Sequence, residues 1–463
     1  MSEVLTESVS ERIAAKLAAS RTPGHLGAHV VLAGPDPARL DRLGDGLARN
    51  GFLVGIVAAG PNLGAQLRAE RPDILVLEGG RSGGWDRRLV SELRAHPETA
   101  HIAVVSASAE GPEFAAYGAG PEIFDDVLAR PVPADILAAR LSPLVRLSTM
   151  AAECRRRIDT RERLHIPGPG LHMPSVEAGT RRILAVGADS AMAHSLGIGT
   201  VGAPSLIHQG AFDVGALEAL FGGQYDALVL GRASESDLAV IERIRAHAAF
   251  YDFPIVILDG KDVDAGHREL YRAGASVTLP SAAAALEVRF ALQALERRKQ
   301  QRAAIRSALR DTLSVMPKDP LTGLPDGSFL DAHAPALAAA ARSRPLVGAL
   351  FSLDAMRHTA YALGPHAARA LMRQVAAWIA SLVRAEDTVA RANEGEVLML
   401  LPGTAPDAAE QVARRIAAIL RHTDMGLPGV EGAVRPWLRT GIASFKDVES
   451  WGHIAERART TLH

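Results

Sequence analysis

Short apolar segments alternate with amphipathic helical segments along most of the chain. Between residues 28 and 146 the strand-sized apolar segments are HVVLAG, DILVLEGG, IAVVSAS and DVLARP, and helical segments such as ARLDRLGDGLARN lie between them. This alternation is typical of a parallel sheet with crossover helices. It predicts one α/β domain over residues 28–146.

The same pattern returns between residues 181 and 285. Here the strand-sized segments are ILAVGAD, DALVLGR, PIVILDG and SVTLP, again separated by helical stretches. A pattern that recurs in this way indicates a tandem repeat. We therefore expect a second doubly wound α/β domain over residues 181–285.

The segments between and after these domains have a different character. Residues 147–180 contain the helix-like MAAECRRRIDTRERLH and then IPGPGLHMPSV, whose prolines and glycines mark a linker. Residues 286–318 carry apolar positions three or four apart, which predicts an amphipathic connecting helix. Such helices often pair between protomers, so we expect a homodimer. Residues 319–463 alternate strands and helices again and form a third α/β unit.

Composition limits the classes of binding partner and the cellular compartments that we expect for this protein. The 463 residues are 48% hydrophobic, enough for several cores, and the formal net charge of −1 gives no overall field that favours nucleic acid or anionic membranes. No apolar stretch is long enough to span a membrane, and the N-terminus lacks the pattern of a signal peptide. The single cysteine, Cys154, excludes an internal disulfide. We expect a cytoplasmic protein without nucleic-acid binding or membrane insertion.

Each repeat resembles the receiver domain of response regulators over nearly its whole length. Receivers hold magnesium with an acidic pair and accept a phosphoryl group on an aspartate, because hard oxygen ligands neutralise charge during the transfer. The corresponding positions are Gly34, Pro35, Glu78, Ser106 and Arg130 in the first repeat, and Gly187, Ala188, Gly231, Asp259 and Leu279 in the second. We expect both repeats to keep the fold and to have lost this chemistry.

Some acidic residues remain near these receiver positions. Glu78, at the acceptor position, is either a permanently acidic acceptor or simply a polar residue at a strand end. Asp36 and Asp189 follow the positions of the acidic pair, and we interpret them as helix N-caps.

The run DPLTGLPD, residues 319–326, resembles the opening of the GGDEF family, the diguanylate cyclases. The hairpin that names the family falls on Asn393, Glu394, Gly395 and Glu396, where only the second acidic position is kept. Glycines at the first two positions let GTP approach the backbone, because only glycine lacks a Cβ. Asn393 and Glu394 therefore oppose GTP by bulk and by charge.

Other positions that hold substrate in this family are also altered. The metal-binding aspartate falls on Ser352, and the acidic metal ligand of the hairpin falls on Gly395. The two residues that would read guanine fall on Ala360 and Arg369. Without both metal carboxylates, no metal ion could activate the 3′-hydroxyl or steady the pyrophosphate. These departures imply a degenerate domain with no cyclase activity and no bound metal.

A second site of the family, which binds the product, is kept. Arg384 and Asp387 form an RxxD pair six positions before the hairpin, and the resemblance implies that they bind cyclic di-GMP without a metal. An arginine fork suits O6 and N7 of guanine, and a carboxylate accepts from its N1 and N2 edge. Arg415 matches a secondary arginine of this site, and Arg414 and Arg391 are further candidates. The alternative is an ordinary solvated charge pair.

The pattern GIGTVG, Gly197 to Gly202, lies some ten residues past its strand, and we interpret it as a loop rather than a dinucleotide site. The histidines lack metal-site spacing.

The order receiver, receiver, connecting helix and GGDEF resembles the PleD-type family of response regulators. Some members of this family have a degenerate active site but keep the RxxD pair. Resemblance to them implies a non-catalytic cyclic di-GMP effector that acts in the cell cycle. Such a protein would be recruited to a cell pole by localisation factors and would bind an adaptor of the ClpXP protease in CtrA degradation. Two alternatives stay open: a residual diguanylate cyclase, and an interaction scaffold that binds no nucleotide.

Overall fold

The structure is a computed structural model of the chain. It describes residues 28–463 apart from 59, 61, 71, 79–83, 97–98, 100–101, 110–123, 130–131, 169–180, 188–191, 193, 195, 197–204, 211–213, 232–233, 248–249, 261–264, 284, 341–344, 354 and 446–449. The expectations for Arg130, Ala188, Asp189 and the GIGTVG loop therefore lie outside the described residues.

The chain divides into two compact units. Unit 2 contains His29–Ala151 and, from strand β6 (Arg181–Val186) onward, the chain to Ile305. Unit 1 contains the last part of helix α6 (Ala134–Arg163), from Ala152, and the chain from Arg306 to His463. Within the described part of the chain, no helix is both long and apolar enough to cross a membrane.

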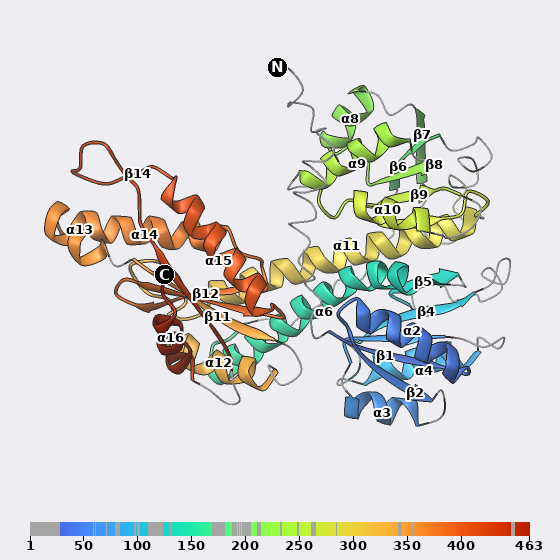
Figure 1. Ribbon diagram of the computed structural model, residues 1–463, viewed down its shortest axis with the longest axis horizontal. Helices are drawn as coiled ribbons and strands as arrows, with labels where there is room; N and C mark the ends of the chain where they lie inside the picture. The colour runs from blue at the N-terminus through green and yellow to red at the C-terminus, as the bar shows by residue number, and fades with distance from the viewer. Residues whose placement is uncertain are drawn as a thin grey trace, which may run out of the picture. The chain divides into compact units, whose positions relative to one another are not determined.

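The first sheet of unit 2 is entirely parallel and has the order β2-β1-β3-β4-β5 (Figure 1). Its strands are β1 (His29–Gly34), β2 (Leu53–Ala58), β3 (Ile74–Leu77), β4 (Ala103–Ala109) and β5 (Asp126–Ala129), and the helices between them are α2 (Pro37–Arg49), α3 (Leu63–Glu70) and α4 (Gly84–Ala95). Strand β3 is buried along its whole length, as expected for a central parallel strand.

The second sheet repeats this order with β10-β9-β8-β6-β7, also parallel throughout. Its strands are β6 (Arg181–Val186), β7 (Ser205–Gly210), β8 (Ala227–Gly231), β9 (Ile255–Leu258) and β10 (Val277–Leu279), with helices α8 (Val214–Phe221), α9 (Glu235–Ala246) and α10 (Ala265–Ala273). In both sheets the first strand lies between the second and the third, which is a doubly wound order. The expectation of a mixed α/β fold with parallel sheets is confirmed. Strands β2 and β7 were not among the predicted segments.

Two long helices follow the two sheets. Helix α6 (Ala134–Arg163) and helix α11 (Ala285–Ser314) each contribute residues to both units. Helix α6 continues without a break past residue 146, where the sequence pattern predicted the end of the first domain. The predicted linker 147–180 therefore begins inside a helix.

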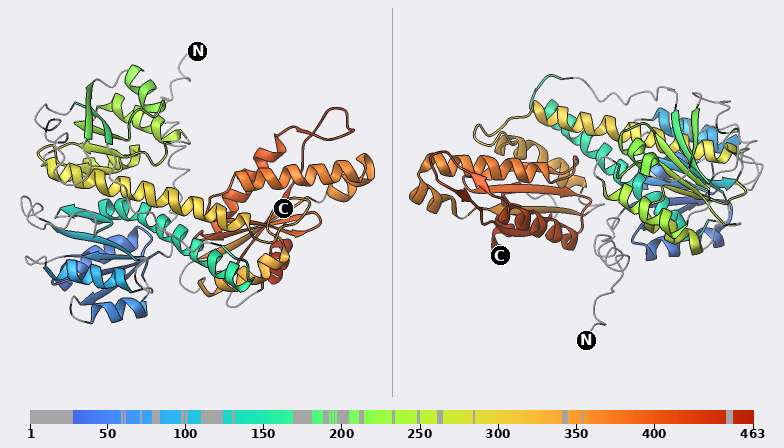
Figure 2. Two further views of the ribbon diagram at one scale, coloured as in Figure 1. Left: turned by 180° about the vertical axis from the view of Figure 1, so that it is seen from behind. Right: turned by 90° about the horizontal axis from the view of Figure 1, so that it is seen from above.

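Unit 1 is built on an antiparallel sheet with the order β12-β13-β11-β16. Its elements are α12 (Gly327–Ala340), β11 (Leu346–Ser352), α13 (Ala355–Leu363), α14 (Pro365–Ser381), β12 (Thr388–Asn393), β13 (Glu396–Pro402), α15 (Pro406–Arg421), β14 (Met425–Gly426), β15 (Ala433–Val434), β16 (Arg439–Ser444) and α16 (Trp451–Thr460). Figure 2 shows the same sheet and helices from two further sides.

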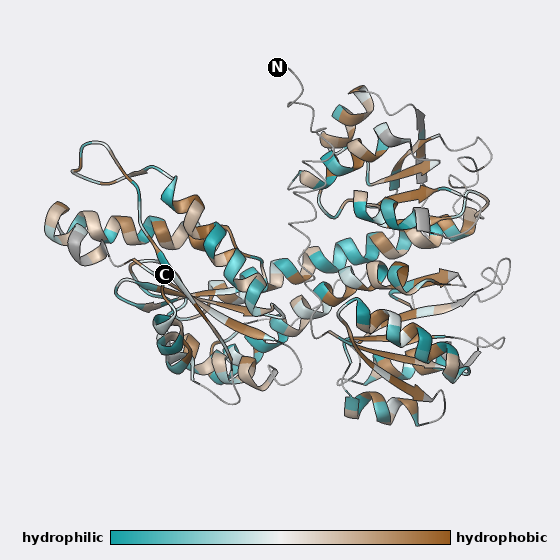
Figure 3. Ribbon diagram, in the orientation of Figure 1, coloured by the Kyte–Doolittle hydropathy of each residue, from teal (hydrophilic) through white to brown (hydrophobic). Residues whose placement is uncertain are grey.

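Each face of this sheet has its own apolar core. One face packs against α14 and α15, with Phe351 and Met399 among its buried residues. The other packs against α12 and α16, with Leu350 and Leu398 buried between them. The strands are accordingly apolar, whereas the covering helices have one hydrophobic and one polar side (Figure 3). The ends of β11, β12 and β13 carry the candidate functional residues.

Candidate functional site

The opening motif of unit 1 is a compact turn that is tied to the hairpin. The Asp319 carboxylate accepts hydrogen bonds from the backbone N–H and the hydroxyl of Thr322 at 2.8 and 2.7 Å, and Gly323 adopts a positive φ of 72°. Burial acts to raise the pKa of Asp319, but the Thr322 hydrogen bonds and the Arg391 charge outweigh it and lower the pKa. Arg391 lies 3.3 Å from Asp319 and also donates to the carbonyls of Asn393 and Glu394. Arg391 thus holds the turn and the hairpin together.

The positions predicted to correspond to the cyclase metal site, Ser352 and Gly395, meet where β11 and β13 pair. Ser352 is buried and opposite Glu396 in the ladder, and the N–H of Leu353 donates to the carbonyl of Gly395 at 2.8 Å. A Cβ at Gly395 would lie 3.2 Å from the carbonyl oxygen of Leu353, so the backbone leaves little room for a side chain. Neither Ser352 nor Gly395 can offer a carboxylate to a metal ion.

The one acidic side chain kept in the hairpin has another partner. Both oxygens of Glu396 accept from Arg459 on α16, at 2.9 Å from Nε and 2.7 Å from Nη2. This fork geometry raises the pKa of Arg459. Among the described residues, no three His, Cys, Asp or Glu side chains are grouped so that they could hold a metal ion. These residues do not fit the magnesium ions that the cyclase chemistry requires.

Ala360 and Arg369, at the positions predicted to read guanine, form no contact with the hairpin among those described. Ala360 is half-buried against the core on the α14 side, and Arg369 is exposed on α14. Asn393 and Glu394 are exposed at the hairpin tip, where the Asn393 side chain accepts from the Glu394 N–H at 2.8 Å.

The RxxD pair lies in the turn between α14 and β12. Arg384 is exposed, whereas Asp387 is only 5% exposed. The carboxylate oxygen Oδ2 of Asp387 accepts from the backbone N–H of Arg384 at 2.9 Å, and the other oxygen, Oδ1, has no hydrogen-bond partner among the described residues. Burial and the nearby charge of Glu386 raise the pKa of Asp387 to about 7, although Arg384 acts in the opposite direction.

The other candidate arginines lie on α15. Arg414 and Arg415 are both exposed, and Arg414 pairs with Glu410 one turn earlier at 2.5 Å. Arg391 is on β12 and is committed to the hairpin as described above. The roles of Arg384, Asp387, Arg414, Arg415 and Arg391 in ligand binding stay predictions.

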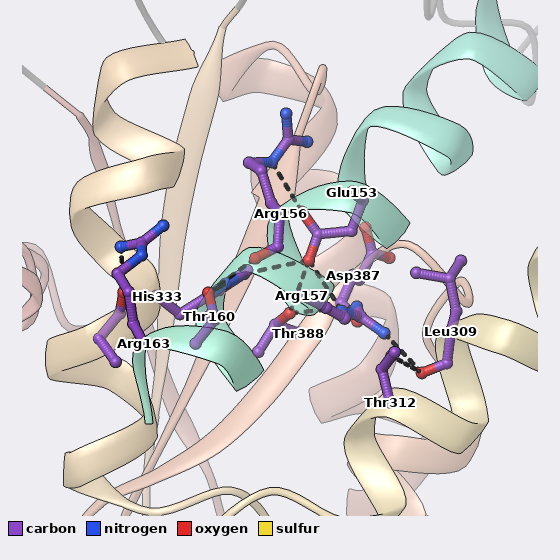
Figure 4. Close-up of polar contacts among 11 residues, drawn as sticks. Glu153, Arg156, Arg157, Thr160, Arg163, Leu309, Thr312, His333, Asp387 and Thr388 are labelled. Atoms are coloured by element: carbon purple, nitrogen blue, oxygen red, sulfur yellow. Dashed lines mark hydrogen bonds and ion pairs between the residues drawn. The ribbon is translucent and has the colours of Figure 1, made fainter. Parts of the chain in front are cut away.

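Sequence reasoning missed a buried polar cluster beside the RxxD turn. Helix α6 contributes Glu153 and Arg157, both fully buried, and α12 contributes His333 (Figure 4). The Glu153 carboxylate accepts from Arg157 Nε at 2.8 Å and from His333 Nε2 at 3.1 Å. The sequence held a signal for this cluster, because Glu153 and Arg157 are four residues apart in a helical segment.

In unit 2 the candidate acceptor position is occupied by a paired side chain. Glu78 is 2% exposed and forms an ion pair with Arg39, one turn into α2. Asp36 caps the same helix by accepting from the N–H of Arg39 at 3.2 Å, which confirms its interpretation as an N-cap. This ion pair with Arg39 is compatible with both interpretations of Glu78, a permanently acidic acceptor and a polar residue at a strand end.

Comparisons with known proteins agree with this division of the chain. Residues 317–463 match the family model described as "Diguanylate cyclase, GGDEF domain". Response regulator PleD of Caulobacter vibrioides is 22% identical over 380 residues, which cover 79% of this chain and 80% of PleD. The chain is thus related in sequence to PleD-like response regulators over most of its length.

Solved structures are similar to a smaller share of the chain. The GGDEF domain of DgcB from Caulobacter crescentus, crystallised with cyclic di-GMP, is 20% identical, with a TM-score of 0.29, and the match covers 31% of this chain and 83% of that one. The diguanylate cyclase SiaD of Pseudomonas aeruginosa, crystallised with its activator SiaC, is 22% identical, with a TM-score of 0.30, and the match covers 36% of this chain and 63% of that one.

Proposed function

We propose that the chain is a non-catalytic receptor for cyclic di-GMP that binds the nucleotide at Arg384 and Asp387. The observation that carries this proposal is the contrast between two sites of unit 1. The positions for catalytic metal hold Ser352 and Gly395, while Glu396 is committed to Arg459. The RxxD pair keeps an exposed guanidinium beside a carboxylate with an unfilled acceptor atom.

The chemistry of the pair suits a guanine base. Arg384 can donate two parallel hydrogen bonds to O6 and N7 of guanine. The Asp387 carboxylate, once ionised, accepts from N1–H and N2–H. Arg414 and Arg415 supply further cations for the two phosphates of the ligand.

Calorimetric titration with cyclic di-GMP tests this assignment. We expect the wild type to bind and Arg384→Ala to lose at least about tenfold in affinity, since charged hydrogen bonds contribute ~1.5–3 kcal/mol each. Another exposed arginine, Arg373 on α14, provides the matched control: Arg373→Ala should bind like the wild type. Equal affinity in all three proteins would refute the Arg384 assignment.

A residual diguanylate cyclase is the second candidate. It is favoured by the description of the family model that residues 317–463 match, and by the similarity to PleD. Incubation of the purified chain with GTP and Mg²⁺ separates the two functions. We expect no cyclic di-GMP to form, whereas turnover lost in Glu396→Gln would establish catalysis. If the chain neither binds nor makes the nucleotide, the remaining alternative is a nucleotide-independent scaffold.

The wider role rests on resemblance to PopA-like members of the PleD-type family. We propose that the two doubly wound domains are degenerate receivers that serve docking and dimerisation. The bound receptor would then recruit an adaptor of the ClpXP protease in the CtrA degradation pathway at a cell pole. Adaptor capture that requires both cyclic di-GMP and an intact Arg384 is the expected result, and capture that ignores the nucleotide would contradict it.

A further inference from the structure

The last turns of helix α6 are part of unit 1, although more than 140 residues separate the end of α6 from Arg306, where the C-terminal part of that unit begins. Glu153, Arg157 and Thr160 of this helix are fully buried there. They face three elements of the unit: α11, α12 and the start of β12 (Figure 4). The segment is therefore packed inside the unit and is not a solvated linker.

The charges of this cluster are compensated internally. Burial acts to raise the pKa of Glu153, but His333 and Arg157 outweigh it and hold the pKa well below its usual range. Arg156 adds a second guanidinium, with Nε at 3.0 Å from Glu153 Oε2. Thr160 closes the cluster, since its hydroxyl lies 2.9 Å from His333 Nδ1. A buried carboxylate with these partners fixes the orientation of the Arg157 guanidinium.

The far side of that guanidinium holds the RxxD turn. Arg157 Nη2 donates to the backbone carbonyl of Asp387 at 3.0 Å and to the Thr388 hydroxyl at 3.2 Å. Arg157 Nη1 donates to the carbonyl of Leu309 on α11 at 3.1 Å. All three nitrogens of the side chain are thus used, and the turn is fixed at the residue whose carboxylate is buried.

The resulting state is closed to ligand. Asp387 is 5% exposed, so a guanine edge cannot reach its carboxylate, yet Oδ1 lacks a hydrogen-bond partner among the described residues. Burying an unfilled acceptor is unfavourable, and a donor from a ligand would relieve it. The two hydrogen bonds from Arg157 are among the contacts that hold the turn in this form.

We propose that residues 153–160 of α6 and cyclic di-GMP compete for the turn from Arg384 to Thr388. This inference rests on the proposed function and adds its regulation. Ligand binds the form in which Asp387 faces outward, while Arg157 binds the form observed here. Because each partner prefers a different state, docking of α6 weakens ligand binding and ligand weakens docking by the same factor.

The test measures cyclic di-GMP affinity in the full chain. Arg157→Lys keeps the positive charge beside Glu153. The compact ammonium group of lysine cannot donate to the turn, to Leu309 and to Glu153 at the same time, as the planar guanidinium does. We expect the variant to bind about 5- to 50-fold more tightly than the wild type, a coupling within the usual allosteric range. The matched control is Arg163→Lys, on the same helix, whose side chain bonds only the carbonyl of Ala332 among the contacts described.

A second variant guards against simple unfolding. The pair Glu153→Gln with Arg157→Met removes both charges at nearly constant volume, so no buried charge of the pair is left alone. It should also bind more tightly, with a cooperative thermal transition retained. Unchanged or weaker affinity in both folded variants would overturn the competition while leaving the receptor assignment intact. Absence of binding in every protein, wild type included, would refute both.

Discussion

Asp387 combines burial with the nearby charge of Glu386, and both raise the pKa of its carboxyl. Its pKa of about 7 lies well above that of an ordinary aspartate. The unfolded pKa is the lower one, so the carboxyl favours the folded state below pH ~4, and this contribution is lost as the pH rises through about 7. A ligand that needs the ionised carboxylate therefore binds only the fraction of the folded protein in which Asp387 has lost its proton.

Cyclic di-GMP affinity should therefore depend on pH. Guanine N1–H and N2–H require the carboxylate, and the ionised fraction of Asp387 rises about tenfold between pH 6 and pH 8. We expect the association constant to rise by a similar factor, measured by calorimetry in both buffers. Asp387→Asn should bind weakly and without this dependence. A wild type that binds equally at pH 6 and pH 8 would contradict the role given to Asp387.

Glu153 presents the opposite case, a buried carboxylate with several cationic partners. Glu153→Ala leaves Arg157 and His333 buried without their acceptor, and loss of one member of a buried ion pair typically costs ~3–5 kcal/mol. We expect a loss of this size in the free energy of unfolding, measured by denaturant titration. The control is Glu456→Ala, which removes an exposed pair with Arg459 and should cost under ~1 kcal/mol. Equal losses would show that the buried cluster is not stabilising.

At the scale of elements, close approach of α16 to the sheet depends on two glycines. A Cβ at Gly441 on β16 would lie 2.0 Å from the carbonyl oxygen of Ala458, and one at Gly348 on β11 would lie 2.5 Å from Ile454. Real Cβ atoms do not make such contacts, so the helix would have to move outward. The bidentate pair of Glu396 and Arg459 would be strained by the same movement.

Gly441→Ala is expected to destabilise unit 1 by ~1–3 kcal/mol or more, because overpacking forces the backbone apart. Thermal unfolding monitored by circular dichroism provides the measurement. Gly426→Ala is the matched control, since a Cβ there meets nothing within 4 Å. A fall in midpoint of the same size in both variants would show that the α16 contact is not the cause.

Sequence patterns predicted the helices and strands well where the hydrophobic period and the length of the apolar run both matched the same type of element. The buried strands β1, β3, β8, β9, β11 and β13 all coincide with apolar runs. Strand β7, SLIHQG, was missed because half of its residues are polar and it lies at the edge of its sheet. The segment 150–165 was expected to be helix-like but was assigned to a linker, because its contacts with Thr388 and His333 cannot be predicted from local periodicity.

The sequence predicts which residue types occupy the candidate site, but it does not predict how far each side chain is buried. Motif spacing identified Arg384 and Asp387, and the absence of carboxylates at Ser352 and Gly395 is visible in the sequence itself. The burial of Asp387 is not visible in the sequence, and its backbone carbonyl is bonded by Arg157, 230 positions earlier. Such long-range contacts are set by tertiary packing rather than by local pattern.

At the scale of the whole molecule, ligand effects should be confined to unit 1. Hydrogen exchange on the full chain, with and without cyclic di-GMP, should change in residues 384–390 and in 152–163. Competition predicts more protection in the first segment and less in the second. Strands β1 and β6 of unit 2 serve as internal controls and should exchange at unchanged rates. Increased protection of residues 152–163 would contradict competition between α6 and the ligand.

The placement of Glu153 and Arg157 also has a consequence for synthesis. Their partner Thr388 lies 235 residues after Glu153, so the ribosome must add all of these residues before the cluster can form. At about 5–20 residues per second this takes roughly 10–50 s. During that time the arginine-rich end of α6, residues 152–163, has been synthesised, but the unit in which it is buried has not yet folded. Early contacts of the nascent chain with chaperones are therefore expected at residues 152–163, well before the C-terminal sheet exists.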